Sequence, residues 1–312
     1  MAPRAALTIA LIAIAFCAPL FASEFWVTLL MQIMIFGLLA LSTDLLLGQA
    51  GLFSLCHAAF FALSAYTVAI LQVRHGFGTA LAAPIGILAG TALAFVFASA
   101  VRTRGVYFIL ITLAFGYIVW GVAYRWASFT GGDNGVTGVP FPSLGSLRVA
   151  STTDYYYVVL SVVLVVAAAY RVLVTSPFGL ALRGIKSSES RMRSLGYNVG
   201  QHLYVAFVLS GLIASIAGVL YVYFNRFVNP TAASFPISVE AVLMTIVGGT
   251  GTILGPFLGS GIILVLRNWA SGYFHYYTAV LGVVFIVTVL WAPQGIMGLL
   301  ARWRSGNRGE GA

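Results

Sequence analysis

Charged residues are scarce in this chain of 312 residues: only 7% are Asp, Glu, Lys or Arg, whereas 61% are hydrophobic and the mean hydropathy is +1.01. A soluble domain of this length needs more polar side chains to cover its surface, so a soluble fold is excluded. The sequence predicts an all-α protein that crosses a membrane several times.

Cysteine is also rare, and acidic residues are outnumbered. Cys17 and Cys56 lie in or beside apolar segments without the spacing of a metal site, so neither a disulfide framework nor a metal site is expected. Sixteen Lys and Arg against seven Asp and Glu give a net charge of +9. These cations form short clusters beside apolar runs, which fits the positive-inside rule of membrane proteins better than nucleic-acid binding.

No nucleotide-binding loop is evident. The nearest candidate, residues 179–187, has one residue too many between its second glycine and Lys186, and it follows no predicted strand. We therefore expect no catalytic residues in this chain, and any ATP hydrolysis would belong to another subunit.

Apolar runs predict about ten transmembrane segments. Seven runs are continuous: 5–22, 25–47, 79–101, 106–126, 155–174, 202–224 and 276–291. Three are shorter or interrupted by glycine: 52–73, 237–249 and 253–269. The first run could be a secretory signal, but its poor cleavage site favours a retained span.

The distribution of cations predicts the orientation. With ten segments, both termini and the loops at 102–104 and 171–201 share one side of the membrane. That side holds eleven of the sixteen cations, namely Arg4, Arg102, Arg104, Arg171, Arg183, Lys186, Arg191, Arg193, Arg302, Arg304 and Arg308. It is therefore predicted to be cytoplasmic, which makes the 127–154 loop periplasmic.

Two similar glycine interruptions suggest an internal repeat in inverted-topology halves. Residues 44–53 (DLLLGQAGLF) and 244–253 (MTIVGGTGTI) each place a Gly-x-x-Gly break after an apolar helix. Paired breaks in the two halves of a transporter indicate a translocation pathway near the membrane midplane, although close helix packing also uses such glycines. The predicted pathway residues are Asp44, Gly48, Gln49, Gly51, His57, Glu240, Gly248, Gly249 and Gly251.

Three of these residues have structural alternatives. Asp44 is either a pathway residue or an interfacial charge. Glu240 follows Pro236, with Ser238 as a possible N-cap, so its carboxylate would suit the helix dipole without any contact to substrate. His57 is either part of a cavity or a packing residue among apolar neighbours.

Five blocks, in order along the chain, carry a family resemblance. They are 46–66 (LLGQAGLFSLCHAAFFALSAY), 129–140 (FTGGDNGVTGVP), 176–183 (SPFGLALR), 227–238 followed by 246–256 (IVGGTGTILGP), and 293–295 (PQG). In these blocks the sequence resembles the membrane permease subunit of branched-chain amino-acid ABC importers. The resemblance implies an inner-membrane complex with a second homologous permease, two ATPase subunits that bind ATP and Mg²⁺, and a periplasmic substrate-binding protein.

The polar 176–201 loop has two interpretations. It could merely fix the topology, or its apolar residues Leu180, Ile185, Met192 and Leu195 could pack as a docking helix. The loop resembles the coupling segment of such permeases, which implies ATPase-coupling roles for Arg183, Glu189, Met192, Leu195 and Gly196. Arg191 and Met192 stand where the family has small residues.

Several functions remain open at this point. The expected function is inward transport of branched-chain amino acids, but related permeases carry urea, amides or aromatic and other carboxylic acids. A sugar or nucleoside permease would share the architecture. A proton-coupled secondary carrier would need titratable groups deep in the membrane, for which the sequence gives little support.

Overall fold

The computed structural model describes residues 16–19, 23–144, 147–148, 151–273, 282 and 295–298. The apolar runs at 5–22 and 276–291 lie almost entirely outside these residues, and so does the C-terminal cluster of arginines.

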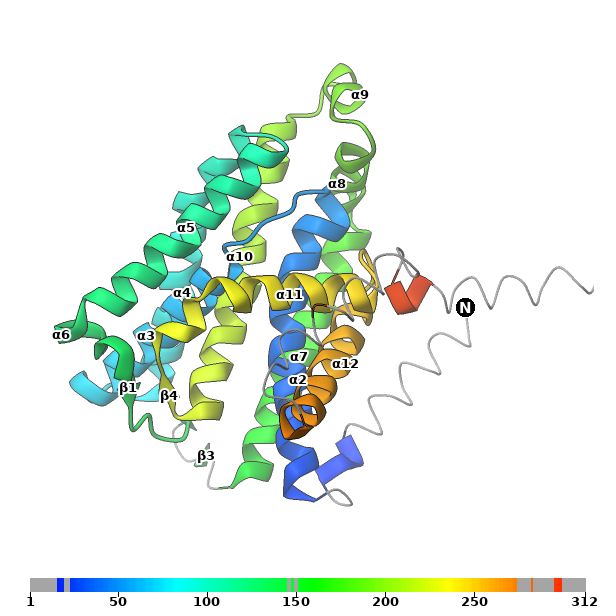
Figure 1. The fold of residues 1–312 in the computed structure, drawn as a ribbon. Helices are drawn as coiled ribbons and strands as arrows, with labels where there is room; N and C mark the ends of the chain where they lie inside the picture. Colours follow the sequence, from blue (N-terminus) through cyan, green and yellow to red (C-terminus); the bar gives the residue numbers. More distant parts are fainter. Residues whose placement is uncertain are drawn as a thin grey trace, which may run out of the picture.

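The described chain is mostly helical (Figure 1). Its longer helices are α2 (Glu24–Asp44), α3 (His57–His75), α4 (Thr79–Phe97), α5 (Val106–Arg125), α7 (Thr152–Thr175), α8 (Pro177–Ser187), α10 (Val199–Asn225), α11 (Phe235–Gly248) and α12 (Gly255–Tyr273). The short helices are α6 (Ala127–Thr130) and α9 (Glu189–Ser194), with 3-10 turns η2 (Ala98–Arg102), η3 (Gly132–Asn134) and η4 (Pro230–Ala233) and the π-helical segment η1 (Leu45–Ala50).

The fold departs from the all-helical prediction in two small antiparallel ladders. Strand β1 (Val136–Thr137) pairs with β4 (Phe227–Val228), and β2 (Ser143–Leu144) pairs with β3 (Leu147–Arg148). The first ladder ties the 127–154 loop to the end of α10. Each strand is only two residues long because the ladders form in connecting segments, outside the apolar runs.

Five helical segments among the described residues are long and apolar enough to cross a membrane. They are Glu24–Ala50, Thr79–Arg102, Val106–Arg125, Thr152–Thr175 and Val199–Asn225. Each coincides within a few residues with a predicted apolar run. The chain is therefore a polytopic membrane protein.

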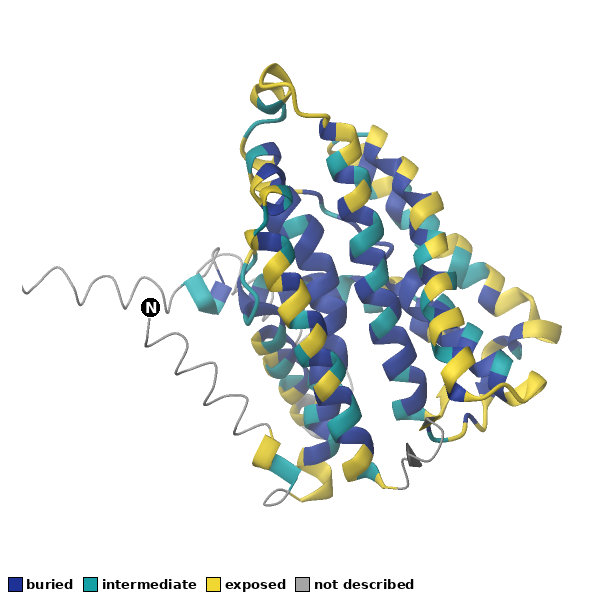
Figure 2. Cartoon of the chain, turned by 180° about the vertical axis from the view of Figure 1, so that it is seen from behind, coloured by how far each residue is buried: buried dark blue, intermediate teal, exposed yellow. Residues whose placement is uncertain are grey.

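Burial separates central helices from peripheral ones (Figure 2). In the most apolar window of α2 with η1, and of α10, 67% of residues are buried, compared with 17% in α5. Small residues allow the central helices to approach: a Cβ at Gly90 of α4 would lie 2.8 Å from the carbonyl oxygen of Phe60 in α3. In lipid such contacts replace the hydrophobic driving force that operates in water.

The 176–201 loop and the 127–154 loop lie at opposite ends of the molecule (Figure 1). Helices α8 and α9 form one end, whereas β1, β3 and β4 form the other. Ser176 caps α8 by accepting a hydrogen bond from Gly179 N, with Pro177 in the first turn, where its missing N–H costs nothing. At the other end, Ser151 and Asp154 form a capping box at the start of α7.

Candidate functional site

Each glycine-rich interruption in the sequence ends a helix. After α2, segment η1 ends at Ala50 and is followed by Gly51, whose φ of +75° is a left-handed conformation that favours glycine. The chain then runs without regular structure until α3 starts at His57. In the second half, α11 ends at Gly248, and Gly249 and Gly251 have φ of +116° and +78° before α12 begins.

The two interruptions meet in space, although about 200 residues separate them in the sequence. Gly251 N–H donates to Asp44 Oδ1 at 2.6 Å, and Gln49 Nε2 donates to the carbonyl oxygen of Gly251 at 3.3 Å. A Cβ at Gly48 would lie 2.5 Å from Gly251 N. The glycine at position 48 is therefore required by the close approach of the second backbone segment.

Asp44 is at the centre of this meeting point. The residue is fully buried, and its second oxygen, Oδ2, accepts a hydrogen bond of 2.7 Å from the Tyr170 hydroxyl of α7. One carboxylate thus joins α2, α7 and the segment between α11 and α12.

Threonines continue the contact between α2 and α11. The hydroxyls of Thr43 and Thr245 lie 2.6 Å apart, and Thr245 Oγ1 also lies 2.8 Å from the carbonyl oxygen of Ala40. Thr43, Tyr170 and Thr245 were not among the predicted site residues. A hydroxyl within an apolar run is the only local signal they give, and it does not identify the partner.

His57 packs between helices. Its Nε2 lies 2.6 Å from Ser210 Oγ, which itself donates to the carbonyl oxygen of Ser42 at 2.7 Å. Because the serine hydrogen is used by Ser42, the imidazole Nε2–H is the donor to Ser210. His57 therefore links α3 to α10 and α2.

Glu240 is paired with Arg267 of α12. Arg267 Nη1 lies 3.0 Å and 3.3 Å from the two carboxylate oxygens of Glu240. The proposed N-cap Ser238 was wrong: the N-cap of α11 is Ser234, and Pro236 occupies the first turn, where proline is tolerated. Ser238 instead accepts a hydrogen bond from Ala58 N, at the start of α3.

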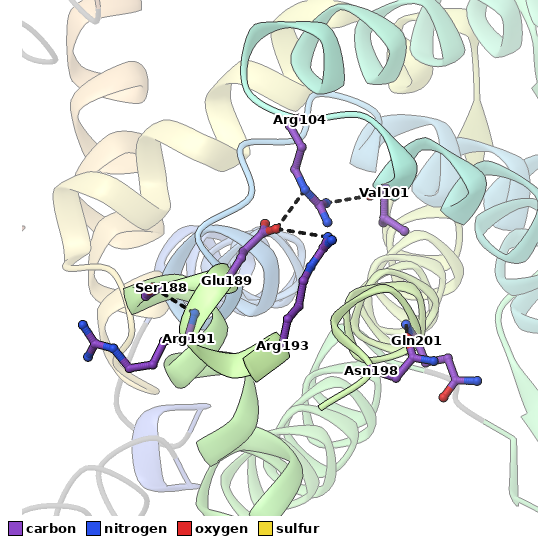
Figure 3. Close-up of polar contacts among 8 residues, drawn as sticks. All are labelled: Val101, Arg104, Ser188, Glu189, Arg191, Arg193, Asn198 and Gln201. Atoms are coloured by element: carbon purple, nitrogen blue, oxygen red, sulfur yellow. Dashed lines mark hydrogen bonds and ion pairs between the residues drawn. The ribbon is translucent and has the colours of Figure 1, made fainter. Parts of the chain in front are cut away.

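Glu189 holds the 176–201 loop to the end of the neighbouring helices. Its Oε2 lies 3.0 Å from Arg104 Nε and 3.8 Å from Arg193 Nη2 (Figure 3). Arg104 also donates to the carbonyl oxygen of Val101 at 2.7 Å. These side chains are about one-third to two-thirds exposed, so we expect each surface ion pair to contribute at most about 1 kcal/mol.

Of the other predicted coupling residues, some make contacts within the chain and one is exposed. Arg183 Nη2 donates to the carbonyl oxygen of Val174 at 3.0 Å, and Met192 packs over Gly184. Gly196, at φ +86°, turns the chain after α9. Leu195 is 67% exposed, so it does not pack within the described part of the chain.

Leu180 of the same loop is also exposed, at 59%, whereas Ile185 is buried. The 176–201 loop therefore presents two large aliphatic side chains at the end of the molecule. Leu195 directly follows α9, which carries Arg191 and Arg193.

Five long apolar helices, with glycine-broken helices meeting beside them, are features of a multi-pass membrane transport protein. The sequence matches the family described as branched-chain amino acid transport system / permease component, over residues 25–289. The chain belongs to this family, and it is a permease component of the branched-chain amino acid ABC transport type. This confirms the resemblance drawn from the five sequence blocks.

Several curated proteins are similar to the chain. The high-affinity branched-chain amino acid transport system permease proteins LivM of Salmonella typhimurium and Escherichia coli are both 28% identical to it. The alignments cover 92% and 93% of this chain and 73% and 74% of those proteins. The ribose import permease protein RbsC of Escherichia coli is 29% identical over 39% of this chain and 41% of its own length. No solved structure matches the sequence.

Proposed function

We propose that this chain forms the translocation pathway of an ATP-driven importer for branched-chain amino acids. The similarity to LivM over more than nine-tenths of the chain carries this proposal. The match to the ribose permease covers less than half of the chain, so it supports the shared architecture rather than a sugar substrate.

The complete protein would have about ten membrane segments in two inverted halves, with both termini in the cytoplasm of a bacterium. The meeting of the two glycine interruptions supports this arrangement, because related breaks in repeated halves come together at the substrate pathway of many transporters. The predicted pathway residues Asp44, Gly48, Gln49 and Gly251 all lie at this meeting point.

The partners would be a second homologous permease, two ATPase subunits that bind ATP and Mg²⁺, and a periplasmic substrate-binding protein. The 176–201 loop would dock to an ATPase subunit. Its exposed Leu180 and Leu195 support this role, because apolar anchors beside a charged rim are typical of an interface. A secondary carrier has less support, since Asp44 and Glu240 are both engaged by partners within the described chain.

Reconstitution of the whole complex tests the substrate and the energy source. With binding protein outside the vesicles and ATP inside, we expect accumulation of labelled leucine, isoleucine and valine. Urea, benzoate and ribose are the comparison substrates. Uptake that prefers one of them would contradict the substrate assignment, and uptake without ATP that a protonophore abolishes would establish a secondary carrier.

Replacing Glu189 and Gly196 together tests the docking role. The change Glu189→Gln removes the ion pairs to Arg104 and Arg193, and Gly196→Ala strains the left-handed turn. We expect this double variant to lose the ATPase subunit or to hydrolyse ATP without uptake, while still inserting into the membrane. Normal uptake with normal subunit retention would contradict the docking role.

A further inference from the structure

The carbonyl oxygen of Gly48 lacks a backbone partner because segment η1 ends just beyond it. In a continuing helix, the N–H of residue 52 or 53 would reach this oxygen. Instead, the N–H groups of Gly51 and Leu52 both donate to the carbonyl oxygen of Leu46. An unpaired carbonyl at a helix end must be satisfied from outside the helix.

Lys186 supplies that donor from a distant part of the sequence. Its Nζ lies 2.7 Å from the carbonyl oxygen of Gly48, across 138 residues. A cation at this position also suits the negative end of the helix dipole. Lys186 belongs to the last turn of α8, so the 176–201 loop is bonded directly to the first glycine interruption.

The side-chain stem of Lys186 makes a second contact with the same interruption. A Cβ at Gly51 would lie 2.9 Å from Lys186 Cγ, so the methylene groups cover this glycine closely. Helix α8 therefore contacts the first interruption through a hydrogen bond and through the packing of the lysine stem.

These contacts continue to the second interruption. Gly48 lies against Gly251, and Asp44 accepts the N–H of Gly251 and the hydroxyl of Tyr170. If α8 moves, Lys186 pulls on the Gly48 carbonyl. Through Gly48 and Asp44, that force reaches Gly251 in the segment between α11 and α12. Among the described residues of the 176–201 loop, no other side chain forms a hydrogen bond to either glycine interruption.

We propose that Lys186 is a positioning residue that transmits movement of the 176–201 loop to the meeting point of the two glycine interruptions. This inference rests on the proposed docking of that loop to an ATPase subunit. It adds the specific connection through which ATP-driven movement reaches the membrane helices. A lysine that only stabilised the end of η1 would change stability without separating hydrolysis from uptake.

The test uses the complete complex in vesicles with Lys186→Met, which removes the ammonium and keeps an unbranched stem. We expect basal ATP hydrolysis to persist, whereas its stimulation by loaded binding protein, together with uptake, falls by about 5- to 150-fold, the usual range of coupling between two sites. Lys186→Arg, which retains a donor cation, should recover part of the loss. The matched control is Arg171→Met, because Arg171 is exposed in α7, precedes the 176–201 loop and has no side-chain hydrogen bond or ion pair among the described contacts.

A chemical rescue separates the ammonium from the shape of the side chain. Lys186→Cys is prepared with Cys17 and Cys56 replaced, and the exposed thiol is modified with 2-aminoethyl or propyl methanethiosulfonate. Both reagents extend the side chain by a similar length, but only the first restores a cation. We expect uptake to recover with the aminoethyl group alone.

Three results would overturn the inference. They are wild-type coupling in Lys186→Met, equal or absent rescue by the two reagents, and loss of the ATPase subunit from the Lys186 variants, which would make the residue an assembly contact. The wild-type complex distinguishes this inference from the proposed function. If wild-type vesicles show no ATP-driven uptake, the proposed function fails, whereas normal Lys186→Met coupling removes only the inference.

Discussion

The hydrogen bond between Asp44 and Tyr170 gives a quantitative prediction for stability. Asp44→Ala would leave the buried Tyr170 hydroxyl without its acceptor, and it would also remove the hydrogen bond donated by the N–H of Gly251, an exposed residue. Tyr170→Phe would remove only one hydrogen bond, and Asp44 would keep its bond to Gly251. The two substitutions share one interaction, so their effects on the free energy of unfolding should not add.

The magnitudes follow from the number of donors affected. The unsatisfied buried hydroxyl costs about 1–3 kcal/mol and the lost hydrogen bond from Gly251 to the charged carboxylate about 1.5–3 kcal/mol, so Asp44→Ala should destabilise the protein by about 2.5–6 kcal/mol. Tyr170→Phe should cost about 1.5–3 kcal/mol, the typical value for a hydrogen bond to a charged group. In the double variant, the sum of the single effects should exceed the measured effect by about 1–3 kcal/mol.

Unfolding in mixed micelles, with a denaturing detergent titrated against a mild one, measures these differences. The control pair is Asp44→Ala with Tyr107→Phe, since Tyr107 is 74% exposed and has no hydrogen bond among the described contacts. That pair should be additive within about 0.5 kcal/mol. If the Asp44 and Tyr170 pair is equally additive, Asp44 does not join α7 to the glycine interruptions as described.

Two further predictions concern the pathway and the orientation. Valine at both Gly51 and Gly249 should block uptake, because their φ values of +75° and +116° are strained for a β-branched residue; a complex of normal yield that imports at the wild-type rate would show that the interruptions are packing features. In a background without the native cysteines, Ser190→Cys should react with an impermeant thiol reagent only after the inner face is opened, whereas Ser143→Cys should react in intact cells. The reverse labelling pattern would invert the topology and the roles of both loops.

The helices were predictable because the membrane restricts the local choices of the chain. A continuous apolar run satisfies its backbone only as a helix, so the runs at 79–101 and 106–126 became α4 with η2 and α5. Helix ends were less predictable. Ser238 precedes Glu240 as an N-cap would, yet α11 begins earlier, at Phe235, so Ser238 lies inside the helix.

The partners across the site were not predictable from local sequence. Asp44 stood out as a rare acid in an apolar run, but its bonds to Tyr170 and Gly251 span 126 and 207 residues. Periodicity and spacing describe only one helix at a time, so they contain no information about which helices become neighbours. Lys186 likewise has no local feature that distinguishes it from the other cations of the 176–201 loop. Its role depends on the contact between α8 and η1, which the local sequence does not predict.

The glycines indicate which backbone segments approach each other better than the charged residues do. A residue without a side chain is needed where another group lies too near for a Cβ. A Cβ at Gly48 would lie 2.5 Å from Gly251 N, so the first interruption has this residue type because of the second. Two similar glycine pairs in one sequence therefore indicate backbone proximity, although neither pair identifies the other. In this chain they meet, and the hydrogen bond from Gly251 to Asp44 joins them, whereas Lys186 donates only to Gly48 of the first interruption. Hydrogen bonds are directional and can exchange partners, which suits a contact between helices that move during transport.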